Sequence, residues 1–164
     1  MCSENDFLLL VSNANSNLLH RAPASITYSI SDDFSANAIE NQSVIEHEIG
    51  DDANIYAIWA RASSSDKWIV MYIGQRSKNN VVERIKQHLF KTPSGTQSKI
   101  EKVKERLSNN HEIGISTIFI SPDALRLSVE DQLIFNNTNE ASQLPWNTKS
   151  RNVPLPRKRK KWVR

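Results

Sequence analysis

The feature that most constrains the fold is a pair of apolar runs that stand close together in the chain. The first run, NIYAIWA, covers residues 54–60, and the second, WIVMYIG, covers residues 68–74. Both are rich in β-branched and aromatic side chains, which favour strands. The polar loop RASSSDK joins them. Two strands joined by a short polar loop are typical of an antiparallel hairpin, so we expect a hairpin over residues 54–74.

Regular patterns continue after the hairpin and predict further helices and a third strand. Apolar residues at helical spacing predict the first two helices. These elements are expected as helices over 79–90 and 97–110 and a strand over 114–120. A third helix begins either at Pro122 or at the capping box Ser128-x-x-Asp131, and runs to about Asn137. The order indicates an α/β (α+β) fold with a small three-stranded, mostly antiparallel sheet flanked by helices.

The first 53 residues have weaker patterns. SITYSI, residues 25–30, alternates as a half-exposed strand does, while SVIEHEIG, residues 43–50, fits either a strand or a short helix. No residue type in this region points to chemistry. We expect an acidic N-terminal arm or subdomain over 1–53, which could serve as an arm, a dimerisation element or a specificity element.

Charge changes steeply along the chain. Residues 1–54 contain nine acidic residues and one basic residue, residues 55–147 contain nine acidic and twelve basic residues, and residues 148–164 contain eight basic residues and no acidic one. A basic end of this kind is typical of proteins that bind a polyanion, and a solvated tail is the alternative.

Cysteine usage and hydropathy indicate a soluble, cytoplasmic protein. The lone Cys2 can form no intramolecular disulfide, which fits a reducing compartment. No stretch approaches the roughly 20 apolar residues that span a bilayer, and FLLLV, residues 7–11, lacks the positive flank and the length of a signal peptide. We therefore expect no membrane partner.

Two of the predicted helices carry polar residues on or beside their apolar faces. On the first helix, Arg84 and His88 lie one turn apart at the edge of the apolar stripe and should point toward the hairpin. On the third helix, Glu130 falls within the apolar arc. Burying an unpaired carboxylate costs on the order of several kcal/mol. We therefore expect Glu130 to meet a metal ion, an arginine or a surface cleft.

Taken together, these elements resemble the GIY-YIG nuclease superfamily, and most closely its small type II restriction endonucleases. The family is named for two strand motifs, which read NIY (54–56) and YIG (72–74) in this chain. It also has an arginine on the first helix, a glutamate on a later helix and an asparagine near the end of the domain. The resemblance covers about residues 54–147 and implies a nuclease domain there, followed by a basic tail over 148–164.

The resemblance assigns candidate roles residue by residue. The implied catalytic residues are Tyr56, Tyr72, Arg84, His88, Glu130 and Asn147. Asn54 stands where the family has a glycine, and we expect the change to be tolerated because that position is structural in the family. The interval before Asn147 is longer than usual, so Asn136 or Asn137 is an alternative to it.

The implied chemistry is phosphodiester hydrolysis. Tyr56 would activate the attacking water, which requires nearby cations to lower the pKa of its phenol from about 10. Glu130 would hold one Mg²⁺, for which Mn²⁺ could substitute, and the metal would stabilise the leaving 3′ oxygen. Arg84 would hold the scissile phosphate through its planar fork, and Tyr72 would orient the water or a phosphate oxygen. No small-molecule cofactor is expected.

Further cations are candidates for contacts with DNA phosphates. They are Arg76, Lys78, Arg157, Lys158, Arg159, Lys160 and Lys161. The bases would be read by the arm, by residues 91–99 or by the region after Asn147.

The expected function is that of a bacterial or phage-encoded restriction enzyme. It would be a Mg²⁺-dependent, site-specific endonuclease acting on double-stranded DNA, and a homodimer because a palindromic site has two-fold symmetry. The alternatives are a low-specificity repair, phage or toxin-type nuclease and a non-catalytic nucleic-acid-binding module.

Overall fold

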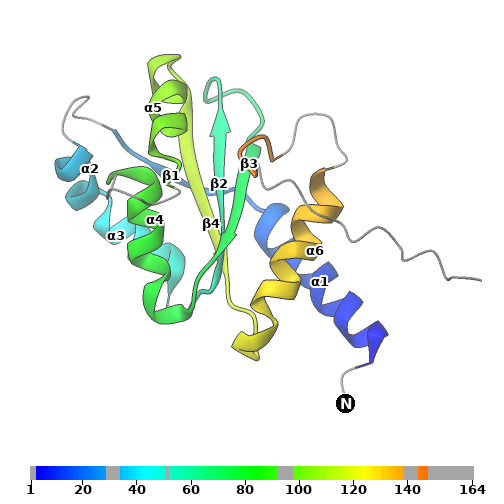
Figure 1. The fold of residues 1–164 in the computed structure, drawn as a ribbon. Helices are drawn as coiled ribbons and strands as arrows, with labels where there is room; N and C mark the ends of the chain where they lie inside the picture. The colour runs from blue at the N-terminus through cyan, green and yellow to red at the C-terminus, as the bar shows by residue number, and fades with distance from the viewer. Residues whose placement is uncertain (1–2, 29–33, 51, 92–97, 139–143, 148–164) are drawn as a thin grey trace, which may run out of the picture.

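A four-stranded antiparallel sheet forms the middle layer of the fold (Figure 1). The computed structural model of the chain describes residues 3–28, 34–50, 52–91, 98–138 and 144–147. The strands are β1 (Ala24–Ile26), β2 (Ile55–Arg61), β3 (Ile69–Gln75) and β4 (Glu112–Ile118), in the order β1-β4-β2-β3. The predicted hairpin is confirmed, because β2 and β3 are antiparallel neighbours.

Helices cover both faces of the sheet. They are α1 (Glu4–Leu19), α2 (Phe34–Glu40), α3 (Gln42–Ile49), α4 (Val81–Leu89), α5 (Ile100–Ser108) and α6 (Arg126–Thr138), with short 3-10 turns η1 (Lys78–Asn80) and η2 (Asp123–Leu125). Figure 1 shows α1 and α6 on one face and α2 to α5 on the other. The three helices predicted after the hairpin are present, and α6 begins between its two predicted starts. Among the described helices, none is both long and apolar enough to cross a bilayer.

Strand β2 lies inside the sheet and is buried on both faces. Tyr56, Ile58 and Ala60 pack into the core under α2 to α5. Alternate residues of the same strand, Ile55, Ala57 and Trp59, pack into the core under α1 and α6. A strand buried on both faces needs an almost continuous apolar sequence, which explains the run NIYAIWA.

The expectation of a three-stranded sheet was wrong, because residues 1–53 contribute a fourth strand. Strand β1 pairs with β4, and Ile26 lies opposite Ile113. Residues 25–30 were expected to alternate as a half-exposed strand, and β1 overlaps that segment only at residues 25 and 26. Residues 27 and 28 are not in a strand, and residues 29–30 lie outside the described residues. Residues 43–50 could be either a strand or a short helix from the sequence alone; residues 43–49 lie within α3, and Gly50 caps its C-terminal end.

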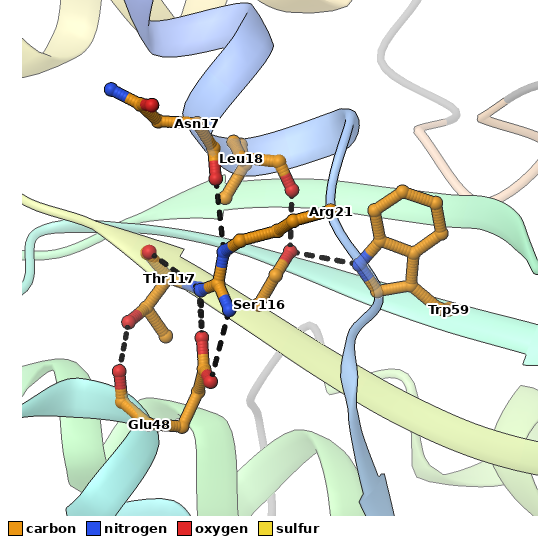
Figure 2. A network of polar contacts seen from close by, with 7 residues as sticks. All are labelled: Asn17, Leu18, Arg21, Glu48, Trp59, Ser116 and Thr117. Atoms are coloured by element: carbon orange, nitrogen blue, oxygen red, sulfur yellow. Dashed lines mark hydrogen bonds and ion pairs between the residues drawn. The ribbon is translucent and has the colours of Figure 1, made fainter.

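A polar network ties the N-terminal helices to the middle of the sheet (Figure 2). Glu48 of α3 pairs with Arg21, and Thr117 of β4 donates its backbone N–H to Glu48 Oε1 at 2.9 Å. In the same network, Trp59 Nε1 donates to Ser116 Oγ at 2.8 Å. Ser116 Oγ donates in turn to the carbonyl of Leu18, also at 2.8 Å. The network joins α1, α3, β2 and β4.

Replacing Glu48 by alanine should lower the free energy of unfolding by about 2 kcal/mol, because the Thr117 N–H and the Arg21 guanidinium would lose their acceptor. Urea unfolding measures this loss. The matched control is Glu101→Ala, which breaks an exposed ion pair with Lys104 and should cost less than about 0.5 kcal/mol. Equal losses in the two variants would show that the network does not hold the N-terminal helices to the sheet.

Candidate active site

Two tyrosines and a histidine form an aromatic cluster between the hairpin and α4. Tyr56 is on β2, Tyr72 is on β3 and His88 is on α4. The ring centroids of Tyr56 and Tyr72 are 6.2 Å apart. The His88 ring lies 5.7 Å from the ring of Tyr56 and 5.2 Å from that of Tyr72. The structure therefore brings together the tyrosines of the NIY and YIG motifs and the helix histidine.

Gly74 makes the approach of the two tyrosines possible. It lies opposite Tyr56 in the hairpin. A Cβ atom added at Gly74 would come within 2.6 Å of Tyr56 Oη and 2.7 Å of Tyr72 Cε1. Both distances are too short for van der Waals contact, so any side chain at residue 74 must displace at least one tyrosine.

For the phosphodiester hydrolysis that the resemblance implies, Gly74→Ala should lower the rate of DNA cleavage by about a hundredfold, because a displacement of about 1 Å in a reacting group has an effect of that size. Overpacking should also cost about 1 to 3 kcal/mol of stability. Cleavage and urea unfolding assays check both effects.

Gly114→Ala is the matched control for Gly74→Ala. Gly114 is in β4, next to β1, and a Cβ atom added to it would lie 3.1 Å from Pro23. This variant should lose stability and keep its cleavage rate. Normal cleavage by Gly74→Ala would show that the positions of the tyrosines do not matter.

The neighbours of His88 determine which ring nitrogen carries its proton. The backbone N–H of Lys99 donates to His88 Nδ1 at 3.0 Å, so Nδ1 carries no proton. The proton of the neutral ring is therefore on Nε2, which lies 2.9 Å from Tyr56 Oη. His88 donates in this bond and Tyr56 accepts, which leaves the phenolic proton of Tyr56 directed to another acceptor.

Burial keeps the His88 ring neutral. The pKa of His88 is lowered from 6.5 to about 3, chiefly because the ring is desolvated. The positive charges of Arg84, Lys99 and Arg76 lower the pKa further. His88 is therefore a neutral hydrogen-bond donor near pH 7 and carries no positive charge to the site.

His88 should make the folded state less stable in acid. Between pH 6.5 and about 3 the unfolded chain binds a proton at His88 and the folded chain does not. The free energy of unfolding should therefore fall as the pH drops through this window, by up to about 1.4 kcal/mol per pH unit for this group. His88→Gln should show a shallower fall in urea unfolding between about pH 7 and pH 4. An unchanged slope in His88→Gln would contradict the account.

Two charged residues act on the tyrosines from opposite helical layers. Arg84 is on α4, and its positive charge lowers the pKa of both tyrosine hydroxyls. Glu130 is on α6, and its negative charge raises both of these pKa values. The predicted arginine and glutamate therefore both lie close enough to the tyrosines to affect their ionisation.

The expectation that cations lower the pKa of Tyr56 was wrong in its net direction. Desolvation raises the pKa of Tyr56 well above 10, and the charges of Tyr72 and Glu130 raise it further. Arg84 lowers it by its charge and by a hydrogen bond. One guanidinium does not outweigh burial, and His88 contributes no charge because it is neutral. Burial also raises the pKa of Tyr72.

Asn147 contacts the backbone of the YIG motif. Its Oδ1 accepts the N–H of Ile73 at 2.9 Å, and its Nδ2 donates to the carbonyl of Ile73 at 2.8 Å. The side chain thus fixes the strand between Tyr72 and Gly74, so that Asn147 acts as a positioning residue. The alternative Asn137 contacts α1 instead, because its Nδ2 donates to Asn15 Oδ1 at 2.8 Å. Asn136 is exposed and accepts a hydrogen bond from Gln132.

Lys99 belongs to the site and was not among the predicted catalytic residues. Its backbone N–H fixes the tautomer of His88, and its Nζ lies 4.9 Å from the centroid of the Tyr72 ring. It lies just before α5, and no periodicity in the sequence distinguishes it. The only sequence signal was weak: Lys99 is the last residue of the stretch 91–99, which was considered for base readout.

The candidate DNA-binding cations are described only in part. Arg76 is exposed just after β3, and its charge lowers the pKa of Tyr72 and His88, so it lies near the cluster. The side chain of Lys78 and the whole basic tail lie outside the described residues. The tail contains the candidates Arg157, Lys158, Arg159, Lys160 and Lys161.

Glu130, whose charge acts on both tyrosines of the aromatic cluster, is the candidate for holding a metal ion. Among the residues that the structure describes, no group of three or more His, Cys, Asp or Glu side chains gathers at one place. Mg²⁺ is commonly held by one or two carboxylates, with water and substrate phosphates as its other ligands. A single carboxylate near Arg84, the arginine expected to hold a phosphate, fits this mode of binding and does not fit a cage made only of protein ligands.

Comparison with models of known protein families finds no match for the chain, and neither curated proteins nor solved structures match it. A functional assignment therefore depends on the residues and on the geometry of the site.

Proposed function

We propose that the chain is a Mg²⁺-dependent endonuclease that hydrolyses phosphodiester bonds in double-stranded DNA. The observation that carries the proposal is the hydroxyl of Tyr56, held 2.9 Å from His88 Nε2 and under the opposing charges of Arg84 and Glu130. A buried phenol with a hydrogen-bond donor, a guanidinium and a carboxylate around it is an arrangement that proton transfer at a phosphate would use.

Tyr56 would accept the proton of the attacking water. To do so it must first lose its own proton, which would pass through its hydrogen bond to the part-buried Tyr72 hydroxyl and from there to solvent. The resulting phenolate would be stabilised by hydrogen bonds from His88 Nε2 and from Arg84. The raised pKa of Tyr56 makes this phenolate a strong base once it is formed. Because His88 has its proton on Nε2, it would act as the donor that orients and stabilises Tyr56.

The other residues would bind and orient the substrate. Arg84 would hold the scissile phosphate through two parallel hydrogen bonds, which the planar guanidinium can donate. Tyr72 would orient the water or a phosphate oxygen. Glu130 would hold Mg²⁺, which when bound stabilises negative charge on the leaving 3′ oxygen.

Site-specific cleavage as a homodimeric restriction enzyme is the form of this activity that we favour. One active site per chain requires two chains to cut both strands of a palindrome. The eight basic residues of the tail, with no acidic one among them, would add contacts with phosphates.

Incubation of the purified protein with supercoiled plasmid and Mg²⁺ tests this proposal. Discrete linear fragments would support a restriction enzyme. Nicked circles or a smear would indicate a nuclease of low specificity. A gel shift without strand breaks, on unmethylated plasmids of several sequences, would overturn the catalytic proposal and indicate a binding module.

A further inference from the structure

A polar cavity lies near the aromatic cluster, and it is lined in part by Arg84, whose charge acts on both tyrosines. Its volume is about 360 Å³, compared with about 30 Å³ for one water molecule in the liquid. Three arginines line it, Arg76, Arg84 and Arg126, and Glu83 is the carboxylate among its described lining residues. The cavity is therefore lined by an excess of positive charge, which favours an anionic ligand.

The three arginines come from different parts of the chain. Arg76 follows β3, Arg84 is on α4 and Arg126 begins α6. Within the part of the chain that the structure describes, Arg76 is hydrogen-bonded only through its backbone N–H, which donates to the carbonyl of Asn54 at 3.0 Å. Its guanidinium is therefore available to a ligand.

Arg126 is held in place by a chain of hydrogen bonds that begins at Asn54. Asn54 is fully buried, and its Nδ2 donates to Asp123 Oδ1 at 2.9 Å. Asp123 Oδ2 accepts from Arg126 Nη1. Arg126 Nε then donates to Gln75 Oε1 at 2.9 Å. Gln75 lines the cavity as Arg126 does.

This chain fixes one edge of the Arg126 guanidinium and leaves the other edge for a ligand. Its Nε and Nη1 are occupied, whereas its Nη2 makes no hydrogen bond to any residue that the structure describes. An arginine fixed in this way loses little conformational entropy when it binds. Its planar donors match the oxygens of a phosphate group.

We propose that the cavity binds a backbone phosphate of the DNA strand next to the scissile phosphate. Arg126 is its principal ligand, Arg76 is a second one, and Asn54 and Asp123 are positioning residues that act through Arg126. This inference rests on the proposed function, because it takes the ligand to be DNA. The GIY motif has a glycine where this chain has Asn54, and a glycine has no side chain that could begin the chain of bonds.

DNA binding by Arg126→Ala tests the proposal. Fluorescence anisotropy with a labelled duplex of mixed sequence, in EDTA and over a range of salt concentrations, measures affinity without cleavage. The variant should bind on the order of fivefold more weakly at low salt. The slope of log affinity against log salt should become shallower by the amount that corresponds to about one phosphate contact. Arg126→Lys keeps the charge without the fork and should lie between the variant and the wild type.

Arg61→Ala is the matched control for Arg126→Ala. Arg61 is the last residue of β2, at the opposite end of the strand from Tyr56. Its guanidinium pairs with Glu112 of β4. It should keep the wild-type affinity and salt slope. Equal affinities and slopes for Arg126→Ala and the wild type would overturn the proposal.

A double-mutant cycle tests the positioning role of Asn54. Asn54→Gly should weaken DNA binding in the wild-type background and have no further effect in the Arg126→Ala background. If the two losses simply add, Asn54 does not act through Arg126 and its assigned role is wrong. Urea unfolding of each variant gives the change in stability separately from the change in binding.

The outcomes separate this inference from the proposed function. If the wild type cuts DNA and Arg126→Ala binds DNA normally, the cavity proposal fails and the nuclease proposal stands. If Arg126→Ala weakens the binding of inorganic phosphate but not that of the duplex, the cavity is a small-anion site and the proposal is overturned. A wild-type chain that neither binds nor cuts duplex DNA overturns both.

Discussion

Tyr56→Phe is expected to slow the cleavage of duplex DNA by about a thousandfold, the size of effect found when a group that transfers a proton is removed. The change removes one oxygen atom and leaves the ring that packs among the hairpin, Tyr72 and His88. DNA affinity should stay within about twofold of the wild type, because the arginines proposed to bind phosphate remain. Single-turnover cleavage and anisotropy measure the two effects separately.

Tyr28→Phe is the matched control for Tyr56→Phe. The hydroxyl of Tyr28 donates to the carbonyl of Leu89 at 3.2 Å, and its ring packs against Phe34 and Phe90. Removing this hydroxyl should cost about 1 kcal/mol of stability and leave the cleavage rate unchanged. If both variants cut DNA equally well, Tyr56 takes no part in the chemistry.

Glu130→Gln is expected to abolish Mg²⁺-dependent cleavage, with a loss of about a thousandfold or more. Glutamine has nearly the same shape but no negative charge, so it should not hold a hard divalent ion. The side chain is only half-buried, and the fold should therefore survive the change. Raising the Mg²⁺ or Mn²⁺ concentration should restore little activity.

Asp131→Asn is the matched control for Glu130→Gln. Asp131 is the next residue on α6 and is exposed. It loses the same charge from the same helix, so a general electrostatic effect on DNA binding would appear in both variants. Wild-type cleavage by Glu130→Gln would show that the catalytic assignment of Glu130 is wrong.

The hairpin and the helices after it could be predicted because their sequence patterns come from local burial. β2 is buried on both faces and β3 is mostly buried, which requires the long β-branched and aromatic runs. α4 has a clear apolar stripe, because Val81, Ile85 and Leu89 are fully buried at helical spacing. Arg84 and His88 could be placed toward the hairpin for the same reason.

Alternation indicated a strand over residues 25–30, but the bounds of β1, its place in the sheet and the folding of residues 1–53 could not be predicted, because they depend on distant partners. Strand β1 pairs with β4, about ninety residues further along the chain. The role of Glu48 likewise depends on Arg21 and Thr117, which are distant in the sequence. A local pattern carries no information about such pairs.

The ionisation of the site could not be predicted either. The sequence places cations near Tyr56, but the net direction of its pKa depends on how deeply the ring is buried. The tautomer of His88 depends on one backbone N–H, that of Lys99, which lies eleven residues further along the chain. Asn54 was expected to be a tolerated change in the motif. In the fold its side chain donates to Asp123, which in turn accepts from Arg126.

The most direct test of the central claim is the cleavage of large, unmethylated DNA by the wild-type protein, followed by analysis of the new ends. Hydrolysis with a 3′ oxygen as leaving group predicts breaks that require Mg²⁺, with a 5′-phosphate and a 3′-hydroxyl at each. Ligation of the cut DNA, without prior phosphorylation of its ends, detects such ends. A folded, DNA-binding protein that makes no breaks with Mg²⁺, or that makes the same breaks in EDTA, would contradict the account.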